Sequence, residues 1–444
     1  MAVAETLAGR ARAVARTGFT PGAVVLAVAV PLIFLHIDYQ LGVRVPLGST
    51  HLGLELSDLA VVAVALAAVY EGVRIGFAPL RPALWVWVSL ASLMLWIALR
   101  SQTLEHGVTA AKFAEYGLLA VSTPLVLRRR ADWELVAAVI VAWSVVATSV
   151  GLLQIFGADI ADAWAAGRRQ PSFLGHSDFA ALSALALGIG LAAVLLAGRR
   201  IGWVGLVSGA LGVMLSGASA GLLGVLAGTA GLLVAIALRR RIAVRDLAIS
   251  IATICVVAAG VTTLRAGDFE QFLKFVGVRS EQRADTGVQT YSHHTLLAYI
   301  GYEIWRDHPV AGAGWQATSE PETVDPVLPA ARRKFPDVSP IAFPTRDHEW
   351  GVQNAYVQAA ADLGLVGFVL WFAPFLIALV LALRANAPPG AIASFALLAA
   401  MGVWVGQGLV AGIPLDAVTW LAVGLAATAA AQRSQAAAQG KWGE

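Results

Sequence analysis

Apolar residues fall along this chain in blocks of roughly 16–24, and short polar segments separate the blocks. A helix rises about 1.5 Å per residue, so a block of this length crosses the ~30 Å hydrocarbon core of a bilayer. The pattern predicts about twelve membrane-spanning helices. We place them near residues 22–37, 56–71, 83–99, 109–127, 133–156, 179–197, 201–216, 219–238, 246–264, 357–383, 390–408 and 411–431. The expected fold is an all-α polytopic membrane protein.

Composition supports lipid as the solvent of this chain. Charged residues make up 13% of the 444 positions, apolar residues make up 58%, and the mean hydropathy is +0.73. A soluble protein usually has about 25% charged residues, so a water-exposed surface is not expected here. We expect membrane lipids as neighbours and no nucleic-acid partner.

Basic residues predict how the chain is oriented, because cytoplasmic segments of membrane proteins are rich in Lys and Arg. With the N-terminus inside, the inner segments hold Arg10, Arg12, Arg16, Arg74, Arg81, Arg128, Arg129, Arg130, Arg199, Arg200, Arg239, Arg240, Arg241, Arg245, Arg384, Arg433 and Lys441. The short outer segments hold Arg44, Arg100, Arg168 and Arg169. We expect a multi-pass protein of the bacterial cytoplasmic (inner) membrane with both termini in the cytoplasm.

Residues 265–356 differ in kind from the apolar blocks, because they are rich in charge and in proline. So long a connector is usually either functional or disordered, and its tryptophans and phenylalanines favour an ordered loop. Within it, residues 292–306 place Leu296, Leu297, Ile300 and Ile304 at helical spacing, which predicts an amphipathic helix. The expected organisation is spans one to nine over 1–264, a large outer loop over 265–356, spans ten to twelve over 357–431 and a cytoplasmic tail over 432–444.

Cationic side chains on the outer side are candidates for binding an anion. Arg168 and Arg169 stand where topology calls for few basic residues, and guanidinium groups match the oxygens of a diphosphate. Lys112 lies in the fourth span, near its outer end. The alternatives are contact with lipid headgroups or an ion pair to Asp159 or Asp162 for the arginines, and a snorkelling lysine paired with Glu115. We expect the outer loop to cover a cavity lined by spans four, five and six.

Histidines and their neighbours on the outer side are candidates for acid–base chemistry, since histidine titrates near neutral pH. His176 follows the arginine pair, and His294 precedes the amphipathic helix. Further candidates gather before span ten: Arg346, His348, Glu349, Gln353 and Asn354. Taken singly, each histidine is better read as a loop residue with satisfied hydrogen bonds, and the prediction depends on the cluster as a whole. No HExxH or similarly tight spacing appears, so we expect no metal and no cofactor.

Five segments, taken in order, resemble the O-antigen ligase and O-antigen polymerase (Wzy-type) superfamily. They are GLLQIFG at 151–157, RRQPSFLGHSDFAAL at 168–182, SGASAG at 216–221, IWRDHPVAGAG at 304–314 and QNAYVQAAADLGLVGFVLWF at 353–372. The resemblance implies a GT-C-like membrane enzyme that needs no metal. Such an enzyme passes a glycan from a polyprenyl-diphosphate carrier (undecaprenyl diphosphate) to a hydroxyl of an acceptor glycan or glycolipid. It also implies arginines that hold the diphosphate and a histidine that activates the acceptor.

This chain departs from the family pattern at several of those positions. Ala220, His294 and Gln353 stand where the family commonly has an arginine, an arginine and a histidine. We therefore expect His348, Glu349 or His294 to act as the base, and Arg168, Arg169, Lys112 or Arg346 to hold the diphosphate. The alternative is a non-catalytic transporter or scaffold of the same fold in envelope-polysaccharide assembly.

Overall fold

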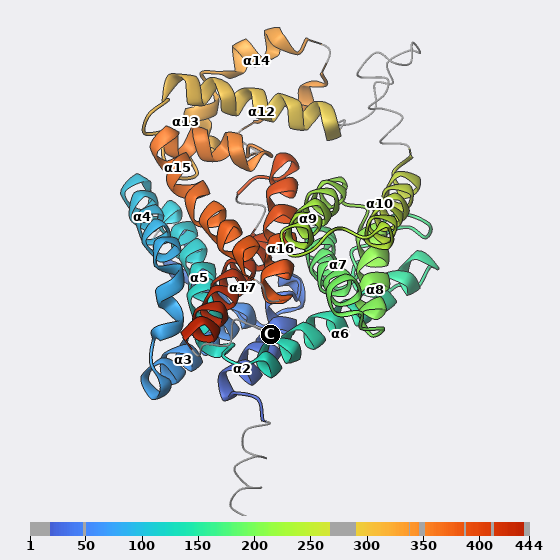
Figure 1. Cartoon of the computed structure of the whole chain (residues 1–444). Helices are drawn as coiled ribbons and strands as arrows, with labels where there is room; N and C mark the ends of the chain where they lie inside the picture. Colours follow the sequence, from blue (N-terminus) through green and yellow to red (C-terminus); the bar gives the residue numbers. More distant parts are fainter. Residues whose placement is uncertain are drawn as a thin grey trace, which may run out of the picture.

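The computed structural model describes residues 18–47, 50–266, 290–336, 338–345, 351–385, 388–409 and 413–438. In this part of the chain a helix lies at each of the predicted spans (Figure 1). These helices are α2 (Pro21–Ile33), α3 (Leu56–Ile75), α4 (Leu84–Arg100), α5 (Leu104–Val126), α6 (Arg130–Ile155), α7 (His176–Ala197), α8 (Gly202–Ser216), α9 (Ser219–Ala237), α10 (Val244–Leu264), α15 (Ala355–Arg384), α16 (Pro388–Val403) and α17 (Ile413–Ala438).

Eight helical segments of the described chain are long and apolar enough to cross a membrane. Many of their large apolar side chains are exposed in the isolated chain, as Val73, Leu95 and Leu99 are. A helical chain with such an apolar exterior is a membrane protein, as the hydropathy pattern predicted. The first helix, α2, ends at Ile33 rather than near residue 37. The chain then enters the short 3-10 helix Ile37–Tyr39, where the His36 carbonyl accepts the backbone N–H of Tyr39.

Small residues bring neighbouring helices close together in one half of the molecule. Gly190 and Gly209 lie at the contact of α7 with α8, where an added Cβ would meet backbone atoms of the facing helix. Gly228 and Gly231 of α9 lie in the same way against the backbone of α16. Such contacts are typical of membrane helices, which associate through close packing rather than through the hydrophobic effect.

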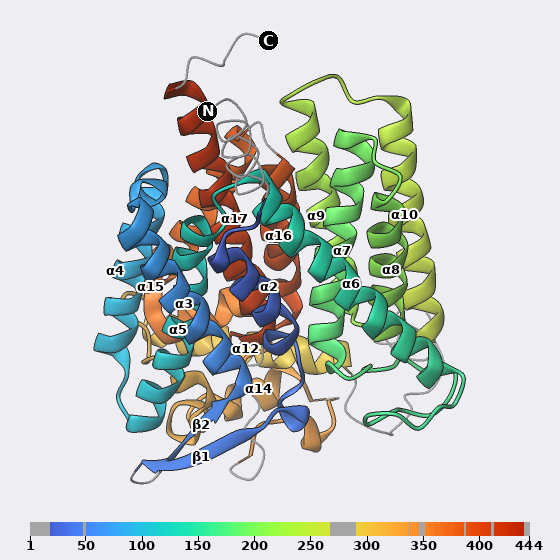
Figure 2. The same ribbon diagram turned by 90° about the horizontal axis from the view of Figure 1, so that it is seen from below.

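A layer of short helices covers one end of the helix bundle (Figures 1 and 2). This covering layer, residues 290–336 and 338–345, contains α12 (Thr290–Asp307), α13 (Pro321–Val324) and α14 (Leu328–Lys334). The predicted amphipathic helix is therefore present as α12. Its buried Leu296, Leu297, Ile300 and Ile304 form a small core with residues of α13, α14 and the segment around Phe343.

The covering layer is joined to the bundle through backbone hydrogen bonds to an interruption in α15. Gly364 has φ 68° inside this helix, which is kinked there. The backbone N–H groups of Leu365 and Val366 donate to the carbonyls of Pro309 and Val310 at 2.9 and 3.2 Å. On the other side of the kink, Ala313 N–H donates to Ala361 O at 2.8 Å.

Side chains of α4 and α5 support the same junction. The Arg100 guanidinium donates to Gly312 O at 2.8 Å, and Trp315 Nε1–H donates to Thr109 Oγ1 at 3.1 Å. His106 Nε2 lies 3.0 Å from a carboxylate oxygen of Glu320. The covering layer is thus fixed over α4, α5 and α15.

One small sheet corrects the all-α prediction. Strands β1 (Gly42–Leu47) and β2 (Thr50–Glu55) pair antiparallel, with Val43 opposite Leu54 and Val45 opposite Leu52. Apolar residues alternate along both strands. This period of two differs from the long apolar blocks from which the spans were predicted, so the hairpin was not expected. Figure 2 shows this hairpin toward the same end of the helices as α12 and α14.

Gly364→Ala should destabilise the fold. The left-handed backbone alone costs about 1–3 kcal/mol for a residue with a Cβ, and that Cβ would meet the Val310 carbonyl. We expect a lower midpoint of thermal unfolding in detergent. Gly107→Ala in α5, where nothing lies within 4 Å of the new Cβ, is the matched control and should leave stability unchanged or slightly raised. Equal midpoints for the two variants would contradict this role of Gly364.

Candidate functional site

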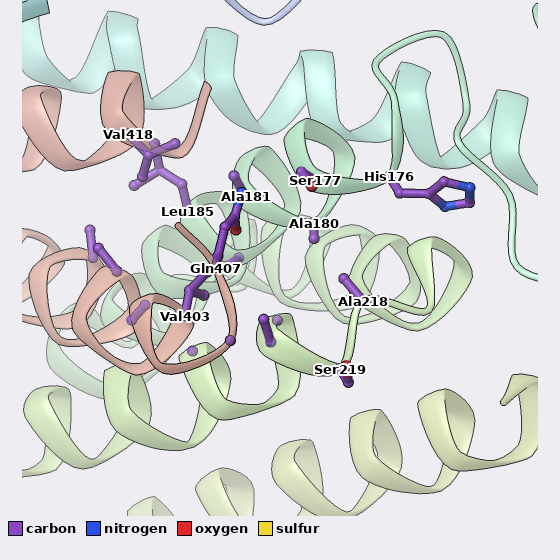
Figure 3. Close-up of a pocket in the computed structure, with 18 of the residues that line it drawn as sticks. His176, Ser177, Ala180, Ala181, Leu185, Ala218, Ser219, Val403, Gln407 and Val418 are labelled. Carbon is purple, nitrogen blue, oxygen red and sulfur yellow. The ribbon is translucent and has the colours of Figure 1, made fainter. Parts of the chain in front are cut away.

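A cavity of about 310 Å³ lies between α7, α9, α16 and α17 (Figure 3). His176 lies at one end of it and Val418 of α17 lies at the other, while Gln407 lies between Ala181 and Val403. The end of α10 and the start of α12 add Arg265 and His294 to its wall. The cavity therefore opens near the covering layer and extends into the bundle.

Polar groups of the cavity are all neutral or cationic. No carboxylate occurs among its lining residues in the described chain. The polar lining consists of Arg169, His176, Ser177, Ser219, Arg265, His294, Gln353 and Gln407. Two guanidinium groups in one wall are suited to an anion with several oxygens, such as a phosphate or diphosphate.

Arg265 is held in place at the point where α10 ends. Its backbone N–H donates to Val261 O at 3.1 Å, and the residue is buried, with 8% of its surface exposed. The guanidinium Nη1 donates to Ser219 Oγ at 3.0 Å and to Gly217 O at 3.3 Å. These contacts place its charge beside the start of α9.

Arg169 approaches the cavity from the segment before α7. Its guanidinium carbon lies 4.5 Å from the centre of the Trp164 ring, a cation–π contact. The Trp164 ring in turn packs edge-on against the His176 ring, with 4.4 Å between centroids. The aliphatic stem of Arg169 lies against Gly217, and the Gly217 carbonyl accepts a hydrogen bond from Arg265. The two arginines therefore converge on the turn between α8 and α9.

His294 and His176 have the same hydrogen-bonding arrangement. His294 Nδ1 lies 3.4 Å from Gln353 O, and His176 Nδ1 lies 3.0 Å from Ser216 O. A carbonyl only accepts, so each Nδ1 carries the proton and each Nε2 is left with its lone pair. Neutral rings in this tautomer are suited to accept a proton from a bound group.

Burial lowers the pKa of His294 below its ordinary value, and the positive charge of Arg265 lowers it further, against the opposing effect of the Gln353 carbonyl. The neighbouring His293 is more strongly affected. Its burial, with the adjacent His294 second, lowers its pKa to about 4. Both rings are therefore neutral at neutral pH.

The inner wall of the cavity is built from small and apolar side chains. Ala180, Ala181, Ala184 and Leu185 come from α7, and Gly221 and Gly224 come from α9. On the opposite side lie Phe395, Ala396, Ala399, Ala400 and Val403 of α16. A cavity with a cationic mouth and an apolar interior fits an amphipathic ligand with an anionic head.

Four of the residues predicted from sequence meet in this cavity: Arg169, His176, His294 and Gln353. Arg168 is exposed and lies outside the lining, since the chain turns between it and Arg169. Asn354 is the N-cap of α15: its Oδ1 accepts from Val357 N–H at 3.0 Å, and its Nδ2 donates to Val405 O at 2.9 Å. Arg346, His348 and Glu349 lie outside the described residues.

Lys112 does not line this cavity, and the prediction that spans four, five and six form its wall was wrong for two of the three spans. Its ammonium group pairs with the Asp58 carboxylate and lies 3.9 Å from Glu115. Of the predicted spans four, five and six, only the sixth, α7, lines the cavity, because the covering layer itself occupies the end of α5 through Trp315.

Arg265, Ser219 and Gln407 were not singled out from the sequence. Arg265 directly follows an apolar block on the predicted outer side, so the charge-bias argument applied to Arg168 and Arg169 would have identified it. Gln407 is a polar residue between two apolar blocks. In the described part of the chain, no group of three or more His, Cys, Asp or Glu side chains is arranged to hold a metal ion.

Comparison with known proteins gives a family for this region. Residues 204–372 match the family model of the O-antigen ligases, which confirms the resemblance predicted from the ordered motifs. The matched region begins in α8 and ends within α15. It contributes Ser219, Arg265, His294 and Gln353 to the cavity. No curated protein matches the chain.

Acid should loosen the covering layer through His293. Its pKa is lower in the folded protein than in the unfolded chain, so the folded state gains stability above about pH 6.5 and loses it as the pH falls toward 4. The loss should be about 2 kcal/mol at pH 5. Hydrogen exchange of α12 at pH 7.5 and pH 5 measures it. His293→Gln should show a smaller pH dependence, and an unchanged dependence would refute the assignment.

Proposed function

From the similarity of residues 204–372 to O-antigen ligases, we propose that this protein transfers a glycan from a polyprenyl-diphosphate carrier to a hydroxyl of an acceptor glycan or glycolipid. The observation that carries the proposal is the cavity itself. Its mouth places two guanidinium groups and two neutral imidazoles together, and its interior is apolar. This combination suits a lipid diphosphate that carries a sugar.

Arg169 and Arg265 are assigned to the diphosphate. Each guanidinium offers planar pairs of N–H donors that match phosphate oxygens. When the bond between the anomeric carbon and the phosphate oxygen breaks, its electron pair stays with the diphosphate, whose negative charge grows. Fixed cations at this position stabilise the developing charge more than they stabilise the intact donor, which is the requirement for catalysis.

His294 is assigned as the general base. Its Nε2 takes the proton of the acceptor hydroxyl while the acceptor oxygen bonds to the anomeric carbon. Gln353, which stands where the family commonly has histidine, acts through its backbone carbonyl by fixing the ring. The lowered pKa keeps the imidazole unprotonated and so available for this step.

The proposal includes a topology. Twelve helices, α2 to α10 and α15 to α17, span the bacterial inner membrane in a GT-C-like arrangement, with both termini cytoplasmic. The covering layer then belongs to the outer loop 265–356. Support comes from the distribution of arginines and from the position of α12 at the end of the bundle where the cavity opens. Ligation and polymerisation differ only in the acceptor that receives the glycan.

Removing either cavity arginine should abolish most transfer. Arg169→Ala and Arg265→Ala each lose a charge-assisted contact of about 1.5–3 kcal/mol, which predicts a ten- to over hundredfold drop. Transfer is measured in cells that lack the chromosomal gene, and binding of undecaprenyl diphosphate is measured by native mass spectrometry of the purified protein. Arg168→Ala, its exposed neighbour, is the matched control and should behave as the parent. If Arg168→Ala loses as much as Arg169→Ala, the cavity does not hold the diphosphate.

His294→Gln should lower transfer by about 10²–10⁴ while the affinity for undecaprenyl diphosphate stays at the parent value. Because the pKa of His294 is depressed, transfer by the parent should decline, as the ring gains a proton, at a lower pH than expected for an ordinary histidine. His176→Gln tests the other imidazole of the cavity. A loss confined to His176→Gln would assign the base to that residue, and transfer at the parent rate in both variants would exclude histidine as the base.

A further inference from the structure

A second cavity of about 480 Å³ lies at the other end of α7. The first cavity uses His176 to Leu185 of this helix, whereas the second uses Ile189 to Ala197. Its remaining walls come from the first half of α6, the start of α8 and the start of α16. The proposed transfer does not use it. We propose that this groove binds one acyl chain of an anionic glycerophospholipid, with the phosphate at Arg130 and Arg199.

The shape of the groove fits a single hydrocarbon chain. Its lining residues on α6 run from Arg130 to Val145, a rise of roughly 22 Å at 1.5 Å per residue. This length covers one leaflet of a ~30 Å hydrocarbon core. Between the charged mouth and Val145 the lining is apolar and mostly small. Ala138, Ala142 and Val145 are exposed in the isolated chain, so the groove is open along its side to the surrounding lipid.

The mouth of the groove carries the charge that selects the headgroup. Arg130 Nε lies 3.0 Å and Arg199 Nη1 lies 3.2 Å from the same oxygen of Glu134. The shared carboxylate holds the two cations side by side. Each guanidinium has five N–H groups and uses one of them in this contact. Together the three groups leave one net positive charge at the mouth.

Two further arginines lie at this end of the molecule. Arg240 Nη2 donates to Leu195 O at 2.9 Å, and its charge is paired with Asp246, 2.6 Å away. Arg245 Nη2 donates to Val194 O at 3.2 Å, also at the end of α7. Basic pockets between membrane helices bind anionic lipid headgroups. A phosphate at the mouth with its acyl chain in the groove satisfies both the charge and the apolar wall. A neutral zwitterionic lipid satisfies the wall alone.

Native mass spectrometry of the purified full chain tests this site. The probes are phosphatidylglycerol and phosphatidylcholine with identical acyl chains. The parent should retain phosphatidylglycerol about tenfold more tightly, because two arginines act against one carboxylate. The double variant Arg130→Gln/Arg199→Gln should bring this ratio close to one. Arg200→Gln/Arg241→Gln, which removes the same charge from exposed positions outside the lining, should keep it.

A second pair of variants tests the acyl-chain groove. Val145→Trp fills the inner end of the groove and should weaken retention of both lipids several-fold. Val146→Trp, on the next residue of the same helix, is exposed but does not line the groove and should change neither. The proposal is overturned if the parent does not discriminate between the headgroups, if both arginine pairs reduce the ratio equally, or if both tryptophan variants behave alike. Glycan transfer is not part of the readout, so the result is independent of the proposed function.

Discussion

The arrangement of this protein depends on how the buried backbone at the break in α15 is satisfied. A helix interrupted inside a bundle leaves N–H and C=O groups without partners, and in an apolar setting each unpaired group costs several kcal/mol. Here the segment 309–314 supplies the missing partners from outside the helix, on both sides of Gly364. The approach is so close that neither Gly312 nor Gly364 has room for a Cβ. One set of backbone hydrogen bonds therefore completes α15 and attaches the covering layer to it.

The cationic groups of the protein differ in their described contacts. In the first cavity, Arg265 donates to a serine hydroxyl and a carbonyl, and Arg169 lies over an indole ring. Outside that cavity, the Lys112 ammonium group lies between two carboxylates, which compensate its charge. In the second cavity, two guanidinium groups share one carboxylate.

Local periodicity was sufficient to predict the helices, including α12, because the apolar face of Leu296, Leu297, Ile300 and Ile304 is visible within fifteen residues of sequence. The site was less predictable, since its parts come from distant segments. Nothing near Lys112 in the sequence shows that Asp58 would reach it from α3. Likewise, the contact of Arg265 with Ser219 joins residues that are 46 positions apart. His176 and His294 were found because their residue type is chemically distinctive, whereas the hydrogen bonds that fix their tautomers are backbone contacts that no motif encodes.

The backbone hydrogen bonds between the covering layer and α15 lie at one end of α12, around residues 309–314. His294 lies near the other end of this helix, where its ring contacts Gln353 O. Thirteen residues of helix separate His294 from Asp307, or roughly 20 Å at 1.5 Å per residue. A tilt of about 3° at the junction would move the imidazole by about 1 Å, a displacement large enough to change a reaction rate by about 10²-fold. The geometry of the junction therefore contributes to the position of the His294 ring, in addition to the direct contact with Gln353.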